Sequence, residues 1–270
     1  MTLCAMLGRM NYQPIIDALR TAGEALRQMQ ATTEVSYTKI TPHQVVTAAD
    51  LEAERIITEA IKKQFPAHGI VAEEQQESYQ QTADYVWYVD PLDGTRNYAS
   101  KIPIYGINAA LVHNDEEIVF GATYLPATDE MCTAEIGQGT FLNGMKVTCS
   151  EQESWDNSVG IGSIVLNAKA LQTFQTLSDL SHGTAWINTI GAPSASGVYL
   201  AAGRRDWFVV RSKTTKEWDW AAPSIIMKEA GCVVTTIKGE DWRIHDKEML
   251  ATNKHLHPAL LEAMQKLGEK

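Results

Sequence analysis

A buried strand that ends in acidic residues is the feature of this sequence that most limits its fold. The run 85–89 (Tyr-Val-Trp-Tyr-Val) consists of aromatic and β-branched residues, which are enriched in strands. Asp90, Pro91, Leu92 and Asp93 follow directly, and residues 94–95 then begin a predicted helix. The sequence therefore predicts a core strand that ends at Asp90 and delivers two carboxylates to a strand-to-helix turn.

The elements around this strand change in character near residue 150. Before it, two amphipathic helices (15–29 and 49–65) accompany strands separated by turn residues, which suggests an antiparallel sheet. After Ser150, strands alternate with helices. The other predicted strands are 69–72, 104–112, 118–124, 131–136, a piece near Phe141, 159–161, 186–190, 207–210, 232–236 and 249–251, and the later helices are 166–180, 194–202, 220–230 and 258–267. We predict an N-terminal α+β half (1–150) with most of the site residues and a C-terminal α/β half (151–270) with the rest.

Composition excludes several classes of protein. The 270 residues are 44% hydrophobic and 21% charged, enough for a sizeable core, so disorder is excluded as the main state. Apolar runs are too short to span a bilayer, and the net charge of −10 argues against a broad nucleic-acid surface. Four scattered cysteines are typical of reduced thiols, and residues 1–9 make a poor signal peptide. We expect a cytoplasmic protein that binds neither membrane nor nucleic acid.

Acidic residues recur at the ends of predicted elements. They are Asp50, Glu73, Asp90, Asp93 and Asp219. Side chains at such ends can converge on one cleft, where clustered carboxylates repel one another unless a cation lies between them. Oxygen-only ligands select hard cations, above all Mg²⁺. Because the backbone N–H groups of Gly94 and Thr95 at a helix start suit an anion, a metal site and a phosphate site would share one turn.

Four blocks of the sequence together resemble the inositol monophosphatase-like superfamily. Residues 90–97 (Asp-Pro-Leu-Asp-Gly-Thr-Arg-Asn) are similar to its first signature, and residues 218–223 with 229–231 to its second. Residues 46–50 and 72–74 match two shorter blocks, in the family's order and at compatible spacing. The resemblance extends from about the first predicted helix to about the last.

The resemblance implies a layered α-β-α-β-α sandwich, with the site of an Mg²⁺-dependent phosphomonoesterase between its two halves. The implied metal ligands are Glu73, Asp90, the Leu92 carbonyl, Asp93 and Asp219. Asp50, Thr95 and Glu73 would be catalytic, with Asp50 and Thr95 orienting the attacking water, and Asp93 with the Gly94 and Thr95 amides would hold the phosphate. Members of the family use two or three Mg²⁺, many are inhibited by Li⁺, and they are commonly dimers, so a homodimer is expected.

The substrate side is less similar to the inositol monophosphatases. Gln44 and Ser212 stand where those enzymes usually carry acidic residues, the second of which contacts inositol. Gly191 and Ala192 fall in a stretch that often reads Gly-Ser/Thr-Ala, so they and Ser212 are candidate substrate contacts. Arg211 is somewhat similar to the bisphosphate 3′-nucleotidase branch, in which an Arg could hold a second phosphate by a bidentate contact.

Inositol monophosphate is the first expected substrate, and other substrates and functions remain as alternatives. The alternatives are 3′-phosphoadenosine 5′-phosphate, fructose 1,6-bisphosphate and histidinol phosphate. A reading of a different class is a catalytically inactive regulatory protein that binds a protein or RNA partner. The complete acidic set argues against it, because a pure binding module has no need of every ligand.

Overall fold

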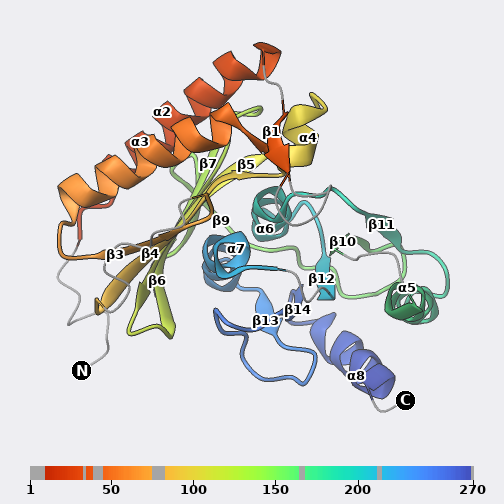
Figure 1. The fold of residues 1–270 in the computed structure, drawn as a ribbon. Helices are drawn as coiled ribbons and strands as arrows, with labels where there is room; N and C mark the ends of the chain where they lie inside the picture. Colours follow the sequence, from red (N-terminus) through yellow and green to blue (C-terminus); the bar gives the residue numbers. More distant parts are fainter. Residues whose placement is uncertain are drawn as a thin grey trace, which may run out of the picture.

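The computed structural model describes residues 10–32, 35–38, 45–74, 83–163, 168–211 and 215–268. Two helices, a seven-stranded sheet, two more helices, a five-stranded sheet and a last pair of helices follow one another as layers (Figure 1). The expected α-β-α-β-α sandwich is confirmed. Within these ranges, no helix is both long enough and apolar enough to cross a membrane.

The elements carry the labels of Figure 1. The helices are α2 (Gln13–Met29), α3 (Ala48–Gln64), α4 (Thr95–Ala99), α5 (Ala168–Leu180), α6 (Pro193–Ala201), α7 (Glu217–Glu229) and α8 (His257–Gly268), with the 3-10 helix η1 (Gln30–Thr32) after α2. The seven-stranded sheet contains, in spatial order, β3 (Gly69–Ala72), β4 (Tyr85–Asp93), β5 (Gly106–His113), β6 (Glu117–Leu125), β7 (Glu130–Glu135), β8 (Gly139–Leu142) and β9 (Met145–Val147). The five-stranded sheet contains β11 (Trp186–Asn188), β10 (Val159–Ser163), β12 (Trp207–Arg211), β14 (Glu248–Thr252) and β13 (Val233–Thr235), and β1 (Val35–Thr38) pairs separately with β2 (Val45–Thr47).

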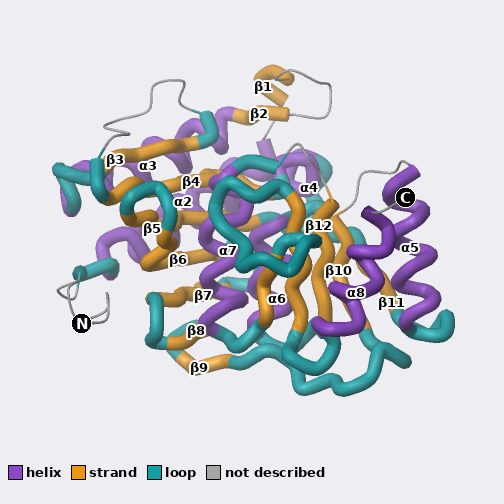
Figure 2. Tube along the Cα trace, turned by 90° about the horizontal axis from the view of Figure 1, so that it is seen from below, coloured by secondary structure: helices purple, strands orange, loops and turns teal. Residues whose placement is uncertain are grey.

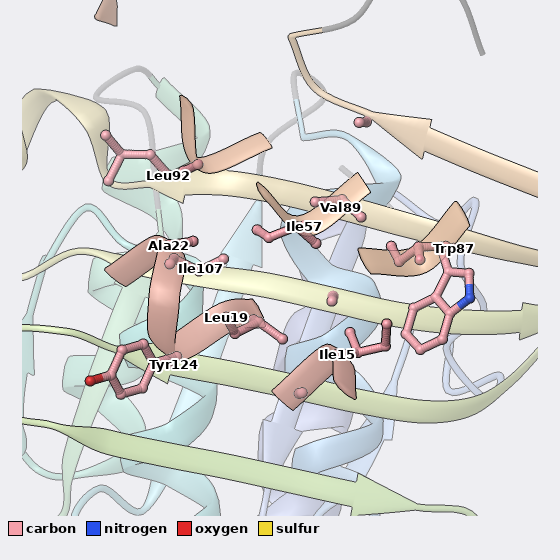
Figure 3. Close-up of a cluster of buried hydrophobic side chains, with 14 of the residues drawn as sticks. Ile15, Leu19, Ala22, Ile57, Trp87, Val89, Leu92, Ile107 and Tyr124 are labelled. Atoms are coloured by element: carbon pink, nitrogen blue, oxygen red, sulfur yellow. The ribbon is translucent and has the colours of Figure 1, made fainter. Parts of the chain in front are cut away.

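Helices α2 and α3 cover the outer face of the seven-stranded sheet because each carries an apolar stripe at helical spacing. Pro14 lies in the first turn of α2, where its missing N–H leaves no helical hydrogen bond unmade. Figure 3 shows the resulting core, in which Ile15, Leu19, Ala22 and Ile57 of the helices meet Trp87, Val89, Leu92, Ile107 and Tyr124 of the sheet. This packing buries one face of β4 along the whole strand.

Helices α6 and α7 lie between the two sheets, whereas α5 and α8 lie on the far side of the five-stranded sheet (Figure 2). One hydrophobic cluster joins Leu125 and Cys132 of the seven-stranded sheet to Val198 of α6 and Ile226 of α7. Strands β10, β11 and β12 are parallel, and β13 and β14 are antiparallel additions. A second cluster joins Tyr88 of β4 to Ala222 of α7, which sets this helix against the β4–β5 pair.

The structure differs from the sequence predictions in a few elements. The strand predicted to end at Asp90 continues to Asp93, because its backbone still pairs with β5. The seven-stranded sheet is antiparallel except for its β3–β4 pair, which is parallel. Strands β1, β2 and β9 were not predicted; each has only three or four residues, too few to show a period.

The division near residue 150 stays a prediction. The first sheet ends at Val147 and the second begins at Val159, but the cluster around α6 and α7 draws on both parts of the chain. Gln44, Ser212 and residues 1–9 lie outside the described residues.

Candidate active site

Pairing between two parallel strands brings Glu73 next to Asp90. Ala72 lies opposite Val89 in the β3–β4 pair, and the Glu73 N–H donates to the Val89 carbonyl at 3.2 Å. One step further along both strands, Glu73 lies beside Asp90. Glu73 is a side-chain hydrogen-bond partner of Asp90, and its charge raises the pKa of Asp90.

A bulge in β4 places Asp93 with Asp90. Side chains alternate along a regular strand, so residues three apart point to opposite faces. Here β5 advances two residues, from Asn108 to Gly106, while β4 advances three, from Asp90 to Asp93. The extra residue shifts the alternation. As a result, the charges of Glu73 and Asp219 act on both aspartates.

Hydrogen bonds within the turn that follows hold its polar groups in place. Asp90 Oδ1 accepts the Leu92 N–H at 3.1 Å, and the Thr95 hydroxyl donates to the Leu92 carbonyl at 2.9 Å. Gly94 has φ +81°, in the left-handed region that favours glycine, and directly precedes α4. The Leu92 carbonyl and the Thr95 hydroxyl therefore lie on one short turn beside the two aspartates.

Asp219 joins these residues from the first turn of α7. Its Oδ2 accepts the N–H of Lys216, the residue that precedes α7, at 2.8 Å. Burial raises the pKa of Asp219 to about 7; the hydrogen bond from Lys216 opposes the rise, and the charge of Glu73 adds to it. The start of α7 thus completes a group of four carboxyl groups.

Burial also raises the pKa of Asp90 and of Asp93 well above its ordinary value. The two residues are only 1% and 6% exposed. The charges of Glu73, Asp93 and Asp219 add to the rise for Asp90. For Asp93, hydrogen bonding by Ser194 opposes the rise, whereas the charges of Asp219 and Glu73 add to it. Each carboxylate therefore disfavours the ionised form of the others.

The donor set fits a hard divalent cation. Among the residues that the structure describes, no three His, Cys, Asp or Glu side chains already stand together as a metal-binding group. The charges of Glu73, Asp93 and Asp219 raise the pKa of Asp90, so these groups oppose one another's charge when no cation is bound. A cation bound between their oxygens would offset this repulsion and favour the ionised form of Asp90. Carboxylate and carbonyl oxygens are the ligands of Mg²⁺ in proteins.

The start of α6 reaches the same turn. The Ser194 N–H donates to Asp93 Oδ2 at 2.5 Å. A Cβ added to Gly94 would lie 3.2 Å from the Ala192 Cβ, so the two chain segments are in contact. The structure therefore brings the predicted substrate-side residues Gly191 and Ala192 next to the predicted phosphate-side turn.

Asn97 ties these two segments together. Its side-chain Nδ2 donates to the Ile104 carbonyl at 2.8 Å and to the Ile190 carbonyl at 2.7 Å. Sequence reasoning assigned no role to Asn97 or to Ser194. The place of Asn97 in the first signature was an available signal, whereas nothing in the sequence marked Ser194 as the residue that contacts Asp93.

Asp50 lies buried in the first turn of α3. Glu54, one turn later and on the same side of the helix, accepts the Glu74 N–H at 2.8 Å. The beginning of α3 therefore packs beside the residue that follows Glu73. The start of α3, which carries Asp50, is therefore close to Glu73. The role of Asp50 in orienting water stays a prediction.

Arg211 is used elsewhere. Its Nε lies 3.3 Å from Glu248 Oε1, and its Nη1 donates to Thr173 Oγ1 at 3.3 Å. Val209, on the same side of β12, packs in the outer cluster with α8. The guanidinium therefore faces the outer helices, and the structure gives no support to its predicted contact with a second phosphate. Its neighbour Ser212 lies outside the described residues.

Comparison with known proteins identifies the family. The model of the inositol monophosphatase family matches residues 11–269. This chain belongs to that family. Inositol-1-monophosphatase of Caulobacter vibrioides is 33% identical over 93% of this chain and 99% of its own. Fructose-1,6-bisphosphatase/inositol-1-monophosphatase of Thermotoga maritima is 32% identical over 84% of each chain.

A solved structure agrees with this membership. The crystal structure of the extragenic suppressor protein suhB from Bartonella henselae has a TM-score of 0.85 and 30% identity, over 94% of this chain and 98% of its own. The inositol monophosphatase family consists of phosphatases that act on small phosphorylated substrates and generally use Mg²⁺. The names of the relatives differ in substrate, so membership alone does not select one.

Proposed function

We propose that this protein is an Mg²⁺-dependent phosphomonoesterase that hydrolyses a small phosphorylated polyol, with inositol monophosphate as its first substrate. The convergence of Glu73, Asp90, Asp93 and Asp219 beside the start of α4 carries the proposal. Carboxylates this close favour a divalent cation, and neighbouring backbone N–H groups suit a phosphate. The inositol-1-monophosphatase names of the Caulobacter and Thermotoga relatives support the choice of substrate.

The metal ligands would be Glu73, Asp90, the Leu92 carbonyl, Asp93 and Asp219, which together would hold two or three Mg²⁺. When bound, the metal would lower the pKa of the attacking water and offset charge on the phosphate. Thr95 donates its hydroxyl proton to the Leu92 carbonyl, so its oxygen remains able to accept a hydrogen bond from that water. Asp50 would orient this water together with Thr95, and Glu73 would act as a metal ligand.

Two segments would enclose the substrate. The Gly94 and Thr95 N–H groups, next to Asp93, would hold the phosphate. Gly191 and Ala192, which contact the same turn, would line the polyol side. Because positioning and charge stabilisation supply most of the catalysis in phosphoryl transfer, the fixed contact between these segments matters for rate.

Phosphate release by the purified full chain with Mg²⁺, with and without Li⁺, tests this proposal. The panel contains inositol 1-phosphate, fructose 1,6-bisphosphate, histidinol phosphate and 3′-phosphoadenosine 5′-phosphate, with Asp93→Asn as the inactive control. We expect Mg²⁺-dependent, Li⁺-sensitive release from inositol 1-phosphate. Turnover of the nucleotide alone would show that the substrate is wrong, and a folded protein that acts on no member would show that the enzyme assignment is wrong.

Fructose 1,6-bisphosphate is the second candidate, because the name of the Thermotoga relative joins both substrates. The nucleotidase alternative has less support, since Arg211 is engaged by Glu248 and Thr173. The regulatory alternative would gain support if Asp93→Asn changed no measured property.

We also propose that the protein is a cytoplasmic homodimer. β11 is an edge strand of the five-stranded sheet, and its Trp186 and Ile187 are 73% and 37% exposed. A large apolar side chain on an open edge is a feature that association commonly covers. Light scattering on the eluting protein should show a dimer, and Trp186→Lys should shift it towards monomer; a monomeric wild type would contradict the proposal.

A further inference from the structure

Two cysteines from distant parts of the chain meet at the C-terminal end of α7. Cys149 follows β9, the last strand of the seven-stranded sheet, whereas Cys232 lies between α7 and β13. Both are free thiols, and they are hydrogen-bond partners of each other. The proposed phosphatase activity uses neither residue.

The end of α7 fixes the position of Cys232. Gly231 has φ +91°, and the N–H groups of Gly231 and Cys232 donate to the carbonyls of Lys228 and Met227, both at 3.0 Å. These bonds form a Schellman motif, the hydrogen-bonded reversal that commonly ends a helix at glycine. The backbone of Cys232 therefore leaves α7 in a defined direction.

The backbone also holds Cys149 against this reversal. Its N–H donates to the Ala230 carbonyl at 2.9 Å, and its Sγ lies 3.8 Å from the position that a Cβ on Gly231 would take. Cys149 and Cys232 are 9% and 7% exposed and belong to one hydrophobic cluster. Hydrogen-bonded backbone on both sides thus keeps the two side chains as neighbours, and such proximity is a precondition for a disulfide.

The two thiols differ in their readiness to react. The hydrogen bond from Cys232 lowers the pKa of Cys149, although burial opposes it. The hydrogen bond to Cys149, together with burial, raises the pKa of Cys232 well above its ordinary value. Because the thiolate is the nucleophile, Cys149 is the residue expected to react first.

We propose that Cys149 and Cys232 form an intramolecular disulfide when the folded protein meets a peroxide. The Cys149 thiolate attacks one peroxide oxygen, the O–O bond breaks, and a sulfenic acid and one water result after protonation. The sulfur of Cys232 then attacks the sulfenic sulfur, its proton leaves with the hydroxyl group, and a second water is released. Two thiols and one hydrogen peroxide thus give one disulfide and two waters.

This bond would join the end of the seven-stranded sheet to the end of α7, the helix whose first turn carries Asp219. A cross-link between distant positions mainly restricts the unfolded chain. The oxidised protein should therefore unfold at a higher urea concentration than the reduced protein, and dithiothreitol should abolish the difference.

Peptide mapping of the folded, full-length protein after treatment with hydrogen peroxide tests the proposal. The treated protein is alkylated and digested without reduction, and mass spectrometry identifies linked peptides. We expect a Cys149–Cys232 link and a fall from four free thiols per chain to two. Cys132→Ser is the matched control, because Cys132 is a buried free thiol on β7; it should leave the link intact.

The order of reaction has its own test. In Cys232→Ser, a sulfenic-acid probe should label Cys149, whereas in Cys149→Ser it should leave Cys232 unlabelled. Labelling of Cys232 instead would overturn the assigned order. A peroxide-treated protein in which both peptides remain unlinked, or a link that forms only after urea unfolds the chain, would overturn the proposed disulfide. Activity on phosphate esters enters none of these readouts.

Discussion

Replacement of Asn97 by Ala should destabilise the fold through one identifiable contact. The Asn97 amide donates to two backbone carbonyls, Ile104 at 2.8 Å and Ile190 at 2.7 Å, and these belong to the segments before β5 and before α6. Each such bond contributes about 1 kcal/mol net, and a carbonyl left without its partner costs somewhat more when buried. Asn97→Ala should therefore lower the free energy of unfolding by about 2–3 kcal/mol.

Thermal and urea unfolding measure this loss. For a chain of this size, 1 kcal/mol corresponds to a shift of about 2–4 °C in Tm, so a loss of about 2–3 kcal/mol in Asn97→Ala should lower Tm by about 4–12 °C. Asn97→Asp should lose at least as much, because a carboxylate cannot donate to a carbonyl. The matched control is Asn188→Ala, which removes a single acceptor of the Arg205 side chain at 3.1 Å and should cost less than about 1 kcal/mol.

The same variant bears on the proposed substrate side. With the Ile190 carbonyl released, the Gly191–Ala192 segment is less well fixed against Gly94, so KM for the best substrate should rise more than kcat falls. Unfolding of Asn97→Ala within about 0.5 kcal/mol of wild type would refute the idea that this amide joins the two segments.

Three further predictions follow from single contacts. Asp93→Asn should reduce Mg²⁺-dependent phosphate release by several orders of magnitude, while thermal unfolding without Mg²⁺ stays close to wild type because one source of buried repulsion is gone; a variant with near-normal turnover would contradict its role as a ligand. Gly160→Ala should lower the free energy of unfolding in urea by about 3 kcal/mol or more, because a Cβ at this position would overlap the Trp207 indole. The control Gly137→Ala should cost about 1 kcal/mol, because its Cβ would have no atom within 4 Å and only the φ of +72° opposes it. Equal losses in the two variants would count against the packing argument. Burial lowers the pKa of His257, so the unfolded chain binds more protons than the folded one, and the free energy of unfolding falls as the pH drops below about 6.5. His257→Gln should reduce this fall, measured as the urea midpoint from pH 7.5 to 5. An unchanged pH dependence would show that other groups, such as His68, cause the fall.

Elements with a strong local pattern were predictable from the sequence. The stripe of α2 (Ile15, Leu19, Ala22, Leu26) repeats at helical spacing, and the run 85–89 is aromatic and β-branched throughout. The short strands β1, β2 and β9 have only three or four residues, too few to show such a pattern. They form because a neighbouring strand is in position to pair with them. Tertiary context, not local propensity, decides such strands.

The places of the acidic residues at element ends indicated that they could share one cleft, but only the family resemblance assigned Asp90 and Asp93 to the same site. Regular alternation would place Asp90 and Asp93 on opposite faces of β4. Residues 90–93 by themselves do not indicate how many residues of the partner strand lie opposite them. The bulge is a property of the β4–β5 pair, because it exists only relative to the shorter path from Asn108 to Gly106. A periodicity argument alone would have separated two residues that the fold brings together.

The buried charges explain why this part of the fold depends on so many hydrogen bonds. The pKa values of Asp90, Asp93 and Asp219 are each raised by burial and by the charges of nearby carboxylates, which is a cost to the folded state at neutral pH. Backbone N–H groups of Leu92, Ser194 and Lys216 each donate to one of these carboxylates and offset part of that cost. These donors come from β4, α6 and the residue before α7, so the acidic group is stable only where all three elements meet. The net charge of −10 is therefore less informative than the positions of the acidic residues. A cation bound among Asp90, Asp93 and Asp219 would interact with the few charges that the fold brings together.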